Sequence, residues 1–325
     1  MNLLVFNLAT DADDPLLSFT SQWLNRLATH YERVDVITMR AGRLITAENV
    51  YVHSVGKEKG YGEVRRALEF YRTLSMLRRS RPYAACFAHM MPLFAVMGAP
   101  LLIEVPITLW YAHRQAHPIL QLATVVSHRV VTASAESFPL KTSKLRVIGH
   151  GIDTDFFSPA ESAATTVPTI VHVARLMPIK HQATLIRALV DVPNAQAVFV
   201  GDVPPDIAPT YRRELEALAR DLGVADRVIF AGNQPPESVR DWNRKAAIAV
   251  NLSPIGLFDK AALESMAVGV PTIVGSTAFD DVVRDERLKV TDLDDHVTLA
   301  KRLNDLLALP ASERREIGAG LRQRV

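Results

Sequence analysis

Short apolar stretches alternate with amphipathic stretches along this chain, and the pattern predicts an α/β protein. The short stretches are rich in Val, Ile and Leu, as buried strands of parallel sheets are. The longer ones carry apolar residues at helical spacing. The expected strands are 3–8, 34–38, 50–55, 83–88, 101–105, 130–133 and 145–148, followed by 169–173, 197–200, 228–230, 248–252, 272–274 and 288–290. The clearest expected helices are 18–30, 63–79, 181–190, 210–222 and 296–309.

A polar segment, "GIDTDFFSPAESAATTVPT" at 151–169, separates two such series of similar size. Strands that alternate with helices indicate right-handed crossovers and parallel sheets. We therefore expect two Rossmann-like domains, 1–158 and 159–325, with ligands bound in a cleft between them. The chain ends in "GLRQRV" within a helical pattern, so we expect the last crossover helix to be incomplete.

The composition is that of a globular protein, with 325 residues, 48% hydrophobic and 22% charged. A single cysteine, Cys86, lies in an apolar run, which suits core packing in a reducing compartment and excludes a disulfide framework. The segment "MNLLVFNLAT" lacks a basic flank, so we expect a first strand there and not a signal peptide. No apolar run is long enough to span a bilayer. These features predict a cytoplasmic protein.

The net charge is +2, and basic residues concentrate in the stretch 57–82, which holds eight Lys/Arg and three Asp/Glu. A solvated amphipathic helix explains this stretch. The functional alternative is attraction to an anionic membrane surface, which would place the protein at the inner face of the membrane. Nucleic acid is not expected as a partner, because no aromatic-basic pattern accompanies the charge.

Two cations flank an expected strand-to-helix turn in "TIVHVARLMPIKHQATLIRAL". Arg175 follows the strand, and Lys180 stands at the start of the helix. Together with the free N–H groups of a helix N-terminus, they could hold a diphosphate and stabilise its departure. The alternative is a solvated loop that happens to contain two basic residues.

A turn, a small-residue helix and a strand follow one another in "SPIGLFDKAALESMAVGVPTIVG", residues 253–275. Asp259 could cap the helix. Glu264 lies inside the helix among Ala, Leu, Ser and Met, where its carboxylate could accept hydrogen bonds from paired hydroxyls such as those of a ribose. An exposed helix glutamate is the alternative.

These stretches resemble, in order and spacing, the retaining nucleotide-sugar glycosyltransferases of family group four, which have the GT-B fold. The segments that carry the resemblance are "VIGHGIDTDFF", "VARLMPIKH", "VFVGD", "VIFAGNQP" and "GLFDKAALESMAVGVPTIV", and more weakly "LWYAHRQ" and "VVTASAESF". The resemblance implies a GT-B fold in which the N-terminal domain faces the acceptor and the C-terminal domain binds the donor.

The resemblance also assigns roles to residues of the C-terminal domain. It implies that Arg175 and Lys180 hold the donor diphosphate and act in catalysis, and that Glu264 binds the nucleotide ribose. The remaining residues implied at the donor are Gly256, Leu257, Phe258, Asp259 and Lys260.

Two positions depart from the family pattern. Gly256 stands where the family has its first glutamate, and Asp259 replaces the usual glycine after the aromatic Phe258. One account is that Asp259 or Lys260 takes over the contact with the sugar. The other is that the chain binds a nucleotide sugar but transfers it poorly. We favour the first, because the other donor residues are present.

In the N-terminal domain the resemblance implies a catalytic role for His113, near the donor sugar. A loop histidine without function is the alternative. Weaker acceptor-side candidates are Asp13, Asp14, Glu136 and His150. The cluster of Asp11, Asp13 and Asp14 has no further ligand spacing, and the family generally needs no metal, so we expect no metal site.

The resulting hypothesis is a retaining glycosyltransferase that moves a sugar from a UDP- or GDP-linked donor to a saccharide or lipid-linked acceptor, in cell-surface glycan synthesis. The nucleotide sugar is a co-substrate, and no cofactor is expected. The alternatives are a non-catalytic nucleotide-sugar-binding protein and a sugar-nucleotide epimerase. A nicotinamide dehydrogenase is disfavoured, because no G-x-G-x-x-G follows the first strand.

Overall fold

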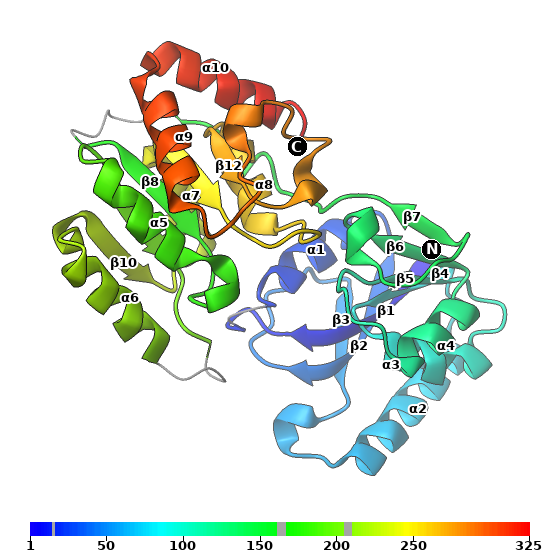
Figure 1. Cartoon of the computed structure of the whole chain (residues 1–325). Coiled ribbons are helices and arrows are strands. Elements are labelled where there is room, and N and C mark those ends of the chain that lie inside the picture. The colour runs from blue at the N-terminus through cyan, green and yellow to red at the C-terminus, as the bar shows by residue number, and fades with distance from the viewer. Residues whose placement is uncertain (15–16, 161–166, 205–209) are drawn as a thin grey trace. The chain divides into compact units, whose positions relative to one another are not determined.

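The computed structural model describes residues 1–14, 17–160, 167–204 and 210–325, and the chain divides into two compact units, Met1–Gly149 and His150–Val325 (Figure 1). The expected division between 158 and 159 lies further along the chain. The difference arises because Phe157 packs into a core cluster of the C-terminal unit with Val171 and Val198. The segment that looks like a linker in sequence therefore begins inside the second unit.

The N-terminal unit is built on a seven-stranded sheet of order β3-β2-β1-β4-β5-β6-β7, in which every pairing is parallel. Alternate residues of β1 belong to different hydrophobic clusters. Leu4 and Phe6 pack into one cluster, and Leu3 and Val5 pack into the other. Both faces of the sheet are thus covered. The strands are β1 (Asn2–Thr10), β2 (Arg33–Ala41), β3 (Val50–Ser54), β4 (Ala85–His89), β5 (Ile107–Trp110), β6 (Arg129–Thr132) and β7 (Leu145–Val147).

Helix α1 (Phe19–Ala28) covers one face of this sheet with Leu24 and Ala28. Helices α2 (Glu63–Ser80), α3 (Pro92–Gly98) and α4 (Pro118–Val126) cover the other. No helix among the described residues is both long and apolar enough for a membrane span.

The C-terminal unit has a five-stranded parallel sheet of order β10-β9-β8-β11-β12. Its strands are β8 (Thr169–Val173), β9 (Gln196–Val200), β10 (Val228–Gly232), β11 (Ile248–Asn251) and β12 (Thr272–Val274). The order reverses between β8 and β11. At such a switch point the connections leave toward opposite faces, which opens a crevice beyond the carboxyl ends of the two strands.

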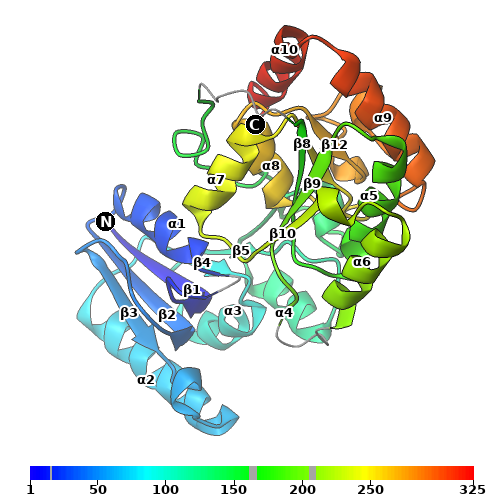
Figure 2. The same ribbon diagram turned by 90° about the vertical axis from the view of Figure 1, so that its left-hand side faces the viewer.

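Helices cover both faces of this second sheet. Figure 2 shows α7 (Pro236–Lys245) on one side of β8 to β10, and α5 (Gln182–Ala188) and α6 (Thr210–Asp221) on the other. Helix α9 (His296–Ala308) packs beside α5. Helix α10 (Ala311–Arg322) packs on α8 (Lys260–Ala267), close enough that a Cβ at Gly318 would overlap the carbonyl of Gly269.

The expectation of an α/β fold with parallel sheets is confirmed, but two expected strands are wrong. Residues 101–105 form the end of a 3-10 turn (Ala99–Leu101) and the loop after it, and the strand of this region is β5, which follows Pro106. When prolines interrupt an apolar run, the sequence does not show which part of the run pairs with a neighbouring strand. Residues 288–290 do not form a strand: in the described part of the chain they make one bridge to the sheet, Val274 to Lys289, at the end of a 3-10 turn (Glu286–Leu288).

Candidate active site

The first predicted donor segment lies directly after β8, at the switch point of the C-terminal sheet. A hydrogen bond from the Gln182 side chain to the Arg175 carbonyl, 2.8 Å long, holds the loop, while the Arg175 side chain is exposed. Within the described parts of the chain, the Arg175 guanidinium has no hydrogen bond or ion pair. Lys180 ends a 3-10 turn (Pro178–Lys180), and its side chain is only 12% exposed.

The second segment lies after β11, the strand paired with β8. Residues 254–257 form a turn closed by a 3.1 Å hydrogen bond from the Leu257 N–H to the Pro254 carbonyl. Gly256, third in the turn, has φ of +82°. This left-handed conformation favours glycine, because a Cβ would meet backbone atoms. The turn therefore favours glycine at the position where the resemblance predicts the first glutamate of the family.

The carboxylate of Asp259 joins the two segments. Lys180 Nζ lies 2.5 Å from Asp259 Oδ2, and Ser253 Oγ donates to the same oxygen at 2.8 Å. Lys180 Nζ also donates to Ser253 Oγ at 2.9 Å. The other oxygen, Oδ1, accepts from the Ala261 N–H at 3.3 Å and caps helix α8. Asp259 is thus both a helix cap and the counter-ion of Lys180.

The electrostatics of Asp259 follow from these contacts. Burial acts to raise the pKa of Asp259, but Lys180 and the hydrogen bonds from Ser253 and Asn251 outweigh it and lower the pKa to about 2. The carboxylate is therefore ionised at neutral pH. The Lys180–Asp259 pair carries no net charge there, and Arg175 is an exposed cation of the loop between β8 and α5.

Lys260 and Glu264 form a second ion pair, one turn apart on helix α8. Lys260 Nζ lies 3.1 Å from Glu264 Oε1, and the Glu264 side chain is 13% exposed. Burial raises the pKa of Glu264, and Lys260 opposes the rise. The glutamate therefore does not lie on an openly solvated helix face.

His150 and Phe258 pack together at the start of the C-terminal unit. Their rings are 6.0 Å apart and stacked, and Phe258 also contacts the Phe279 ring at 4.8 Å. Burial lowers the pKa of His150, which favours the neutral imidazole. The structure thus places His150, expected on the acceptor side, among the predicted donor residues. The predicted site residues Arg175, Lys180, Leu257, Asp259 and Glu264 all belong to this unit.

The other acceptor-side candidates belong to the N-terminal unit. Asp13 pairs with Arg43 at 2.5 Å, and Asp14 is buried, pairs with Arg40 and accepts from the Leu17 N–H at 2.8 Å. Both carboxylates tie the loop after β1 to the end of β2. Among the described residues no cluster of His, Cys, Asp or Glu is arranged to hold a metal ion.

His113 and Glu136 are exposed in the same unit. His113 Nδ1 accepts from the Gln115 N–H at 3.1 Å, and Glu136 lies on a 3-10 turn (Ala135–Ser137). Their predicted roles toward a sugar or an acceptor stay predictions.

Sequence reasoning missed Ser253 and His172. Ser253 is fully buried and touches both Lys180 and Asp259, and its position just after β11 was the available signal. His172, on β8, is 1% exposed and has no hydrogen-bond partner among the described residues. Burial, followed by the charge of Lys180, lowers the pKa of His172 to about 3. Nothing in a strand pattern distinguishes such a histidine from its apolar neighbours.

Comparison with known proteins supports the resemblance read from the motifs. Residues 167–308 match the family of "Glycosyl transferases group 1". The chain is 34% identical over 146 residues to a D-inositol 3-phosphate glycosyltransferase of Acidothermus cellulolyticus, covering 40% of this chain and 32% of that protein. It is 28% identical over 214 residues to a GDP-mannose-dependent alpha-(1-6)-phosphatidylinositol monomannoside mannosyltransferase of Mycolicibacterium smegmatis, covering 58% and 53%.

The chain thus spans about a third to a half of the length of these curated relatives. Solved structures match over almost its whole length. The sucrose-phosphate synthase of Thermosynechococcus elongatus has a TM-score of 0.75 at 20% identity, covering 99% of this chain and 94% of that one. Anabaena HepE in complex with UDP and glucose has a TM-score of 0.78 at 18% identity, with the same coverage. The predicted resemblance to GT-B glycosyltransferases is confirmed.

Proposed function

We propose that this chain, which matches the family of "Glycosyl transferases group 1" over residues 167–308, is a retaining glycosyltransferase that uses a nucleotide-sugar donor. The observation that carries the proposal is the meeting of two segments at the sheet switch point. Arg175 and Lys180 follow β8, and Asp259 and Glu264 follow β11. Crevices at such switch points are where α/β sheets bind ligands.

The chemistry assigns each group a task. Arg175 presents an exposed guanidinium, which can bind two phosphate oxygens and offset the charge that develops as a diphosphate departs. The carboxylate of Glu264 accepts hydrogen bonds from the ribose hydroxyls of the nucleotide. The departing diphosphate oxygen takes the proton of the acceptor hydroxyl on the same face of the sugar, so the anomeric configuration is retained without an obligatory enzyme nucleophile. His113 is proposed to bind a hydroxyl of the donor sugar.

The donor is a UDP- or GDP-sugar, and the acceptor is a saccharide or a lipid-linked saccharide of a cell-surface glycan. The relatives support these classes, because one is named as GDP-mannose-dependent and acts on a phosphatidylinositol mannoside, and HepE was solved with UDP and glucose. The alternative is a chain that binds a nucleotide sugar without transferring it. The observation that favours this alternative is the pairing of Lys180 with Asp259.

A thermal-shift panel of UDP-, GDP-, ADP- and CDP-sugars, followed by donor hydrolysis, tests the proposal. We expect one nucleotide series to raise the melting temperature and its sugar to be released slowly. The variant Glu264→Gln should weaken nucleoside binding about tenfold, a loss of about 1.4 kcal/mol. Binding without hydrolysis or transfer would favour the non-catalytic alternative. If the protein bound none of the tested nucleotide sugars, the proposed donor site would be refuted.

We further propose that α2 contacts an anionic membrane surface. Its exposed side chains include Val64, Leu68 and Tyr71. Arg72 and Arg79 flank a surface hollow of about 490 Å³ on the same helix. Apolar side chains beside cations are suited to the membrane interface, where apolar groups insert and cations meet anionic headgroups.

Co-sedimentation with vesicles tests this contact. Wild-type protein should bind phosphatidylglycerol vesicles more strongly than phosphatidylcholine vesicles, and Arg72→Glu/Arg79→Glu should remove the difference. Arg26→Glu/Arg129→Glu, which reverses two exposed arginines elsewhere in the same unit, is the matched control. Equal losses in both variants would show an effect of net charge alone and refute a role for α2.

A further inference from the structure

The carboxylate of Asp259 occupies a position built to hold an anion. An ammonium, a hydroxyl and a backbone N–H converge on it, at 2.5 Å from Lys180, 2.8 Å from Ser253 and 3.3 Å from Ala261. The N–H belongs to the first turn of helix α8, whose partial positive charge also favours an anion. These are the donors that a phosphate group accepts in nucleotide sites.

The charges around Lys180 show how Asp259 affects the binding of another anion. Arg175 and Lys180 lie in the loop between β8 and α5, and Asp259 neutralises Lys180. Lys260 is paired in the same way with Glu264. His172 adds no cation, because its pKa is lowered to about 3. An arriving diphosphate therefore meets a carboxylate among the donors it would use.

We propose that Asp259 is an affinity-determining residue, an internal anion that takes the place of a donor phosphate at Lys180. The inference rests on the proposed function of this site. A diphosphate reaches Lys180 only when the Lys180–Asp259 contact breaks, and the free energy of that contact is lost from binding. Asp259 thereby weakens diphosphate binding and keeps Lys180 paired in the free protein.

Asp259 is also a helix cap, and this structural role can be separated from the proposed one. Asparagine caps helices about as well as aspartate, and glycine costs only a few tenths of a kcal/mol relative to them. Asp259→Asn therefore removes the charge and keeps the cap, while Asp259→Gly opens the position. A residue that served only as a cap would leave diphosphate binding unchanged in the asparagine variant.

Calorimetric titration of the full chain with GDP, UDP and inorganic pyrophosphate provides the test. We expect Asp259→Asn and Asp259→Gly to bind the preferred diphosphate at least about tenfold more tightly than wild type. The matched control is Asp285→Asn, which alters another carboxylate that caps a turn and pairs with a cation, Arg287. Its affinity should equal that of wild type.

The outcomes separate this inference from the proposed function. Binding by wild type with equal or weaker binding by both Asp259 variants would overturn the role of Asp259 and leave the donor site standing. Binding by the variants alone would support the inference in its strongest form. Binding by none of the proteins would overturn the donor site itself, and the inference with it.

Discussion

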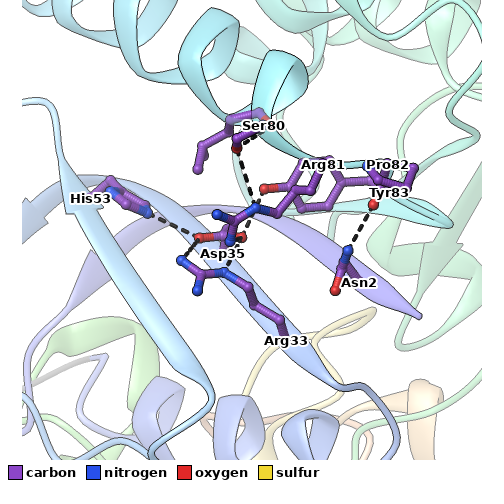
Figure 3. A network of polar contacts seen from close by, with 9 residues as sticks. Asn2, Arg33, Asp35, His53, Ser80, Arg81, Pro82 and Tyr83 are labelled. Carbon is purple, nitrogen blue, oxygen red and sulfur yellow. Dashed lines mark hydrogen bonds and ion pairs between the residues drawn. The ribbon is translucent and has the colours of Figure 1, made fainter.

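Two carboxylates, Asp35 in the N-terminal unit and Asp259 in the C-terminal unit, are held by cations in different ways. Asp35 is fully buried and has four partners (Figure 3). They are Arg33 at 2.9 Å, His53 at 3.1 Å, Arg81 at 3.4 Å and the Tyr83 hydroxyl at 2.7 Å. Asp259 is 20% exposed, and among the residues that the structure describes it forms an ion pair with one cation, Lys180.

The difference follows from where each residue lies on its sheet. Asp35 is near the amino end of β2, and its partners Arg81 and Tyr83 precede β4, which is separated from β2 by β1. The cluster therefore joins segments near the amino ends of these strands, whereas open α/β sheets bind ligands beyond the carboxyl ends. Asp259 follows the carboxyl end of β11. We therefore interpret the ion pairs of Asp35 as structural, and we propose that the ion pair of Asp259 lies where a ligand binds.

The largest expected effect is a loss of activity without a loss of stability at Arg175, in the proposed donor site. Arg175→Ala should lower sugar transfer by about 10²–10³-fold, as loss of one charge-stabilising donor does. Because its side chain is exposed, the free energy of unfolding should hardly change. Steady-state transfer rates and urea unfolding measure both quantities. Full activity of this variant would refute the diphosphate role of Arg175.

Asp35→Asn should show the opposite result. We expect the free energy of unfolding to fall by about 2–4 kcal/mol, less than for a wholly buried pair because the arginines are partly exposed. The affinity for nucleotides should not change. Asp13→Asn, which alters an exposed aspartate–arginine pair of the same unit, is the control and should unfold like wild type. Equal stability of Asp35→Asn and this control would show that the cluster is not structural.

Acid should distinguish the two carboxylates by the pH at which their stabilisation is lost. Both have a folded pKa below the ordinary value of 3.8. Burial opposes the shift in each, while the partners His53, Arg33 and Tyr83 of Asp35, and Lys180 of Asp259, cause it. Their stabilisation is present above the unfolded pKa and is lost as the pH falls through the folded one.

For Asp259 this window runs from about pH 4 to about pH 2 and corresponds to about 2 kcal/mol. Urea unfolding at pH 7, 4, 3 and 2 should therefore show a shallower acid loss in Asp259→Asn than in wild type. In Asp35→Asn the free energy of unfolding should also fall less with decreasing pH than in wild type, and this difference from wild type should extend to lower pH than for Asp259→Asn. Parallel curves for all three proteins would contradict both assignments.

The smallest effect concerns the turn that leads to Asp259. Gly256→Ala should lower the free energy of unfolding by about 1 kcal/mol, because a Cβ is strained at φ of +82°. Gly60→Ala places the same strain at φ of +73° in a turn of the other unit. The control should lose similar stability without a change in nucleotide affinity, whereas Gly256→Ala should alter both. An unaltered nucleotide affinity in Gly256→Ala would show that the turn does not shape the site.

The sequence by itself determined the alternation of strands and helices and the two-part organisation. It also indicated the two segments that we propose to bind the donor. Periodicity, caps and charged residues beside turns act over short distances, so sequence patterns report them. Asp259 could be predicted as a helix cap for the same reason. The conformation of residues 101–105 could not be predicted, because apolar residues between prolines fit a strand and a buried loop equally well.

Only the tertiary structure decided which residues meet. The pairing of β8 with β11 brings Lys180 to Asp259 and Ser253, which lie more than 70 positions away along the chain. In the N-terminal unit, the tertiary fold likewise brings four described partners to Asp35 from three separate segments. Sequence patterns report local conformation and burial, whereas a long-range ion pair depends on strand order, which the chain acquires only when its hydrophobic faces pack.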